Sequence, residues 1–160
     1  MNNVISYLES HRSQALEGLK DFLRIPSVST DPEHTKDLQR CAQYLSNELE
    51  RIGMRNVRVN PTAGHPIVTA EWLGAPGKPT VLFYGHYDVQ PPEPLELWEN
   101  DPFDPTVRGE DLYARGSTDD KGQVWIHVKS LEAHLRENGS CLLYTSDASD
   151  DTPCVDLGGR

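Results

Sequence analysis

His86 and Asp88 are the residues whose types and spacing best suit chemistry. They follow an apolar, strand-forming run at residues 81–84, and Pro91-Pro92 closes the stretch. This pattern predicts a buried strand that ends there, because proline cannot continue a strand ladder. Side chains two positions apart on a strand share a face, so we expect His86 and Asp88 side by side. An imidazole beside a carboxylate suits a metal ligand held by an acceptor, or an oriented base.

A second acidic motif, Asp119-Asp120, lies in the stretch ARGSTDDKG at residues 114–122. It leads into residues 124–135, where apolar side chains recur at helical spacing. One of the two aspartates is therefore expected at a helix N-terminus, where free backbone N–H groups favour an anion. Zinc accepts imidazole nitrogen and carboxylate oxygen, so one hypothesis is that the two motifs meet around a metal. The alternative is a set of ordinary surface residues, because a bare His-x-Asp is weak evidence.

The rest of the pattern predicts the elements that must position these residues. Pro26 ends the first helix and Gly53 closes the second. The order of elements indicates an α/β layered domain with mixed strand directions. In chain order we expect helices over 4–23 and 32–52, strands over 56–60, 67–73 and 81–85, a packed proline- and acid-rich loop over 91–105, a hairpin over 107–113 and a helix over 124–135.

Composition narrows the class of protein. The chain has 160 residues, of which 36% are hydrophobic and 25% charged, as in one globular domain. The net charge of -10, without a lysine and arginine cluster, speaks against a nucleic-acid surface. No apolar run is long enough to cross a bilayer. The N-terminus lacks the basic and apolar regions of a signal peptide, so we expect a cytoplasmic protein that binds neither nucleic acid nor membrane.

The last stretch, residues 141–160, breaks every pattern so far. It resembles the translation of a sequencing adapter, so we expect residues 1–140 to be the natural domain and 141–160 an artefactual tail. A natural polar tail is the alternative. Without the tail, Cys41 is the one cysteine, and its place on an apolar helix face predicts a core thiol rather than a nucleophile.

Several motifs together resemble one enzyme family. They are GHYDVQP at 85–91, LYARGSTDDKG at 112–122, RIPSVS at 24–29 and WENDPF at 98–103. The combination is similar to the co-catalytic zinc metallopeptidases of the carnosinase, aminoacylase and succinyl-diaminopimelate desuccinylase type, over essentially residues 1–140. The resemblance implies a three-layer α/β catalytic domain with a mixed sheet and flanking helices, of which this chain holds a truncated, N-terminal part.

The resemblance also implies roles for individual residues. His86 and Asp119 would be metal ligands, with Asp119 bridging two zinc ions, and other divalent metals such as manganese or cobalt are possible. Asp88 would have a catalytic role by orienting His86 through its second ring nitrogen. The peptide bond after Asp119 would be cis. Asp120, Lys121 and Gly122 would support that turn, and Asp120 is assigned no ligand role.

The family needs groups that this sequence does not supply. They are a Glu-Glu pair that provides the general base and a ligand, a further acidic ligand, a late histidine and a second, dimerising domain. We therefore expect a fragment of a hydrolase that cleaves dipeptides by zinc-activated water, itself inactive. An N-acyl-amino-acid deacylase or desuccinylase of the same family is one alternative, and a non-enzymatic binding module is another. The implied partners are a small peptide or N-acyl amino acid and, for full-length relatives, a second subunit.

Overall fold

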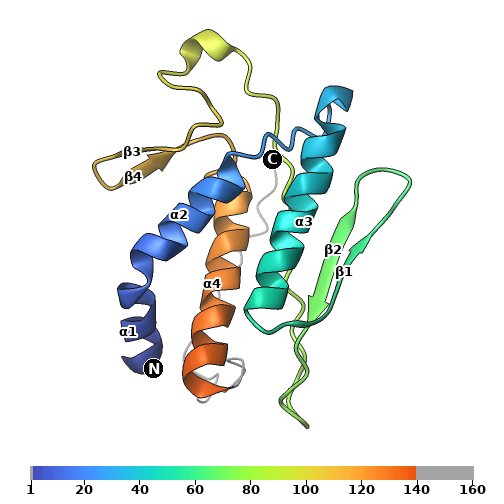
Figure 1. Ribbon diagram of the computed structural model, residues 1–160, viewed down its shortest axis with the longest axis vertical. Helices are drawn as coiled ribbons and strands as arrows, with labels where there is room; N and C mark the ends of the chain where they lie inside the picture. The colour runs from blue at the N-terminus through green and yellow to red at the C-terminus, as the bar shows by residue number, and fades with distance from the viewer. Residues whose placement is uncertain (1, 140–160) are drawn as a thin grey trace.

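A computed structural model describes residues 2–139, so the expected tail at 141–160 lies outside the described residues. Figure 1 shows α4 between the α1–α2 arm and α3, with the β1–β2 hairpin against α3. No helix among the described residues is long and apolar enough to cross a membrane. In chain order the elements are α1 (Asn2–Ser10), α2 (Arg12–Leu23), the 3-10 turn η1 (Pro32–His34), α3 (Thr35–Arg51), β1 (Arg55–Asn60), β2 (Ile67–Glu71), the 3-10 turn η2 (Leu95–Leu97), β3 (Thr106–Arg108), β4 (Asp111–Tyr113) and α4 (Lys121–Asn138).

The predicted first helix is in fact two helices that meet at His11. The hydroxyl of Ser10 donates to the carbonyl of Tyr7 at 2.9 Å, and Nδ1 of His11 lies 2.9 Å from the same oxygen. Side chains that reach back to a helical carbonyl compete with the main-chain ladder and bend it. The prediction of one uninterrupted helix was therefore wrong at this point, although α2 ends before Pro26 as expected.

The core forms where α2, α3 and α4 meet. Its buried centre includes Phe22, Cys41 and Trp125, and the indole N–H of Trp125 donates to the carbonyl of Ala15 at 2.8 Å. The burial of Cys41 confirms that it is a core thiol. Burial of this kind is the main favourable term in folding, so these three helices hold the domain together.

The strands form two antiparallel pairs, of which the second is the hairpin predicted over 107–113. β1 pairs with β2, and β3 pairs with β4 through a two-residue turn between Arg108 and Asp111. A parallel bridge joins Val28 to Val89 outside these strands. The bridge matters for the site, because it brings the RIPSVS stretch against the segment that follows His86 and Asp88.

The prediction of a buried strand at residues 81–85 was wrong. The structure assigns no strand there, and Leu82 and Tyr84 are 91% and 87% exposed. An apolar run forms a stable strand only when another strand satisfies its backbone groups. No strand pairs with it among the described residues, so the pattern reported apolar character correctly and burial wrongly.

A pair of leucine substitutions tests this contrast. Leu38→Ala removes a fully buried side chain and should lower the free energy of unfolding by about 2–5 kcal/mol. Leu82→Ala removes an exposed side chain and should change it by less than about 0.5 kcal/mol. Urea unfolding followed by circular dichroism measures both. An equal loss for the two variants would show that residues 81–84 are packed.

Candidate functional site

The structure brings the two predicted motifs together at His86. Its Nε2 lies 2.9 Å from Oδ1 of Asp119. Its Nδ1 lies 3.1 Å from both the carboxylate Oδ1 and the main-chain carbonyl of Asp88. The imidazole is therefore held between two carboxylates, one from its own segment and one from the turn before α4.

The turn before α4 sets the position of Asp119. Asp120 is the N-cap of α4, as the sequence predicted for one of the two aspartates, and the Asp119–Asp120 peptide bond is cis, as the resemblance implied. The carboxylate of Asp120 accepts a hydrogen bond from the main-chain N–H of His86 at 3.0 Å. Adjacent aspartates thus contact the side chain and the backbone of the same histidine.

Two glycines allow these segments to approach so closely. A Cβ at Gly85 would lie 2.5 Å from Cγ2 of Val124 in α4. A Cβ at Gly122 would lie 2.0 Å from the carbonyl oxygen of Ser117. Any larger residue at either position would push α4 or the turn away from His86, because real Cβ contacts are never this short.

Lys121 anchors the same turn to the end of α2. Its side chain is fully buried, and its ammonium donates to the carbonyls of Phe22 at 3.0 Å and Ile25 at 2.7 Å. From the sequence, the resemblance implied only that Lys121 supports the turn, without naming a partner. Lysine is among the residues least often buried, so no pattern in the sequence pointed to this anchor.

The charges around the imidazole decide its protonation. Partial burial lowers the pKa of His86, but the hydrogen bond to the Asp88 carbonyl and the carboxylates of Asp88 and Asp119 outweigh it, so the pKa is raised. With Nδ1–H donating to Asp88, the neutral ring would point a lone pair at Asp119. A second proton or a bound cation removes that repulsion.

The atoms facing each other fit a metal ion in chemistry and nearly in distance. Two ligand atoms on one tetrahedral zinc, each at its usual bond length, lie about 3.3 Å apart. Nε2 of His86 and Oδ1 of Asp119 are 2.9 Å apart, so a small opening admits the ion. The side chain of Asp119 is 76% exposed, which leaves its second oxygen accessible. Within residues 2–139 no group of three or more His, Cys, Asp or Glu side chains is arranged to hold a metal.

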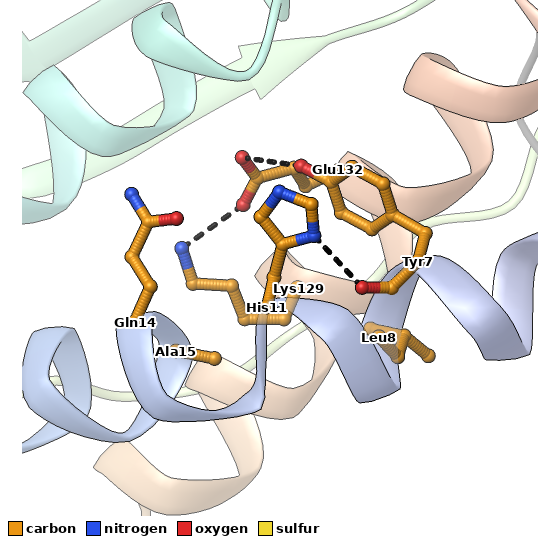
Figure 2. Close-up of a pocket in the computed structure, with 7 residues that line it drawn as sticks. All are labelled: Tyr7, Leu8, His11, Gln14, Ala15, Lys129 and Glu132. Carbon is orange, nitrogen blue, oxygen red and sulfur yellow. Dashed lines mark hydrogen bonds and ion pairs between the residues drawn. The ribbon is translucent and has the colours of Figure 1, made fainter.

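A separate small cavity lies where α1 and α2 meet α4 and includes none of these residues (Figure 2). It is lined by Tyr7, Leu8, His11, Gln14, Ala15, Lys129 and Glu132 and has a volume of about 20 Å³, room for about one water molecule. Its polar groups already pair with one another: Lys129 with Glu132 at 3.0 Å, and Tyr7 with Glu132 at 3.4 Å. We therefore assign it to the packing of the helices.

Comparison with known proteins gives a consistent result. Residues 82–145 match the sequence model described as Peptidase family M20/M25/M40. The chain is 35% identical to "Cys-Gly metallodipeptidase DUG1" of Candida albicans, over 79% of this chain and 29% of that one. It is 39% identical to "Succinyl-diaminopimelate desuccinylase" of Bordetella parapertussis, over 90% and 36%.

A solved structure supports the same fold. The crystal structure of human carnosine dipeptidase 1 superposes with a TM-score of 0.76 at 31% identity, covering 83% of this chain and 30% of that one. The α/β fold class predicted from the sequence is therefore confirmed. In each comparison this chain spans only about a third of the relative's length.

The ionisation of His86 can be measured directly in metal-free protein. An NMR titration should give a pKa above the ordinary value, and Asp119→Asn should lower it because one of the carboxylates loses its charge. Because the folded-state pKa is the higher one, this ion pair stabilises the fold at low pH. That contribution is lost as the pH rises through the folded-state pKa. Asp111→Asn, on β4, is the control and should leave the titration of His86 unchanged.

Proposed function

This chain belongs to peptidase family M20/M25/M40, and from that membership we propose that it carries the first part of the metal centre of a hydrolase that cleaves dipeptides. One observation carries the proposal: Nε2 of His86 and Oδ1 of Asp119 face each other at 2.9 Å, while Asp88 holds the opposite ring nitrogen. The arrangement presents one nitrogen and one oxygen to a shared cation.

Each of these residues then has a distinct proposed role. His86 and Asp119 would hold a divalent cation, which we propose to be zinc, and the side chain of Asp119 is 76% exposed. Asp88 fixes the ring so that Nε2 is the free ligand atom, as acceptors beside metal-binding histidines do. When bound, such an ion polarises a substrate carbonyl and acidifies water.

The remaining groups are proposed to come from the part of the relatives that this chain does not span. The described residues offer two facing donors, whereas catalytic zinc takes three protein ligands. Residues 140–160 contain no glutamate to act as the general base. We therefore propose that the chain binds metal weakly and that turnover requires the longer protein.

A desuccinylase acting on an N-acyl amino acid is the second candidate. It is favoured by the 39% identity to the Bordetella enzyme, which is higher than the 35% identity to the Candida dipeptidase. Both reactions hydrolyse an amide, so the same His86 and Asp119 serve either. A cytoplasmic location and a dimeric full-length enzyme stay predictions.

Zinc titration tests the metal site. Isothermal titration of the wild-type chain should show weak binding, and His86→Ala and Asp119→Ala should each weaken it at least about tenfold, because each removes one of two facing donors. His127→Ala removes an exposed histidine and is the control, with unchanged affinity expected. Equal affinity in all four proteins would rule out this pair as the ligands.

An activity assay tests the hydrolase assignment. The 160-residue chain should not turn over a panel of dipeptides and N-succinyl amino acids. A chimera in which residues 2–139 replace the matched segment of the Candida dipeptidase should hydrolyse one class of these substrates and lose activity with His86→Ala. Turnover by the chain alone would contradict the proposal that the general base lies in the part of the relatives that this chain does not span. A folded, metal-loaded but inactive chimera would contradict the hydrolase assignment.

A further inference from the structure

Two adjacent aspartates contact one histidine in different ways. Asp119 faces the imidazole Nε2 at 2.9 Å, and Asp120 accepts from the main-chain N–H at 3.0 Å. We infer that Asp120 is a positioning residue, whose carboxylate fixes the backbone of His86 so that the ring reaches Asp119. This inference rests on the proposed metal site and adds a residue to it.

The segment before His86 needs such a fixed point. Its apolar side chains are exposed, and no strand pairs with residues 81–85 among those described. Beyond His86 the chain is tied down, because the Ser27 hydroxyl donates to the Tyr87 carbonyl at 2.7 Å and the Val89 N–H donates to the Ser27 carbonyl at 2.9 Å. The hydrogen bond from Asp120 supplies the hold at His86 itself.

Asp120 is itself held rigidly. It is the N-cap of α4, and its own carbonyl accepts from the N–H of Val124 at 2.9 Å. The next residue, Lys121, is buried and hydrogen-bonded to main-chain carbonyls at the end of α2. A carboxylate placed on a fixed helix start can hold a neighbouring main chain to within a fraction of an ångström, which a functional site requires.

The same geometry separates the duties of the two neighbours. Oδ2 of Asp120 is engaged by the His86 N–H, whereas the side chain of Asp119 is 76% exposed and faces the ring. A carboxylate oxygen already committed to an N–H is a poorer cation ligand. The inference therefore predicts that the two aspartates respond differently to the same substitution.

The test uses the full chain and two variants, the conservative Asp120→Asn and the truncating Asp120→Ala. Asparagine keeps an acceptor oxygen, so the zinc affinity of Asp120→Asn should stay within about threefold of that of the wild type. Alanine removes the acceptor and should weaken zinc binding about 10- to 100-fold, the usual range for partners of ligand residues. Asp119→Asn should weaken binding despite its similar shape, and Asp111→Ala, on β4, should have no effect.

A metal-free readout keeps this inference separate from the metal proposal. Hydrogen exchange of the His86 amide should be faster in Asp120→Ala than in wild type and restored in Asp120→Asn, with α4 amides unchanged in both. Unchanged exchange at His86 in folded Asp120→Ala, or equal loss in both variants, would overturn the positioning role. If wild type binds no zinc while the exchange pattern holds, the metal proposal fails and the positioning role stands.

Discussion

The buried ammonium of Lys121 is the interaction on which the geometry of the site depends. An unpartnered buried charge is too costly to keep, so the carbonyls of Phe22 and Ile25 must lie where they can accept from it. Burial lowers the pKa of Lys121, and its ammonium also lies 5.1 Å from the centre of the Phe22 ring. A cation near the end of a helix is also favourable for the helix dipole. The end of α2 and the start of α4 are thereby fixed together, and the Asp119–Asp120 turn with them.

A second charged cluster joins the second half of α4 to α1 and α3. Arg51 pairs with Glu132 at 2.6 Å and with Glu48 at 2.7 Å, and Lys129 pairs with both acids. Burial alone would raise the pKa of Glu132, but its bonds to Arg51 and Lys129 lower it. Tyr7 of α1 reaches the same carboxylate (Figure 2). Because each charge has a partner, α4 is held at its start by Lys121 and further along by this cluster.

Sequence reasoning succeeded where one local pattern carried the signal. The pairing of His86 with Asp88 followed from strand alternation near a proline pair, although the strand itself was not found. The start of α4 followed from helical spacing after Asp119-Asp120. Reasoning failed where the outcome depended on partners far along the chain. An apolar run does not indicate whether another strand will pair with it. Likewise, nothing in the sequence near Lys121 predicts that its ammonium donates to carbonyls 96 and 99 positions earlier.

The exposed apolar run at residues 81–84 has a consequence for handling the protein. Val-Leu-Phe-Tyr carries no charge and no proline, and its side chains favour extended structure. An uncovered segment of this kind offers its unpaired backbone to identical copies, which is how intermolecular sheets nucleate. The stretch that delivers His86 to the site is therefore also the place where concentrated solutions of this chain will begin to aggregate.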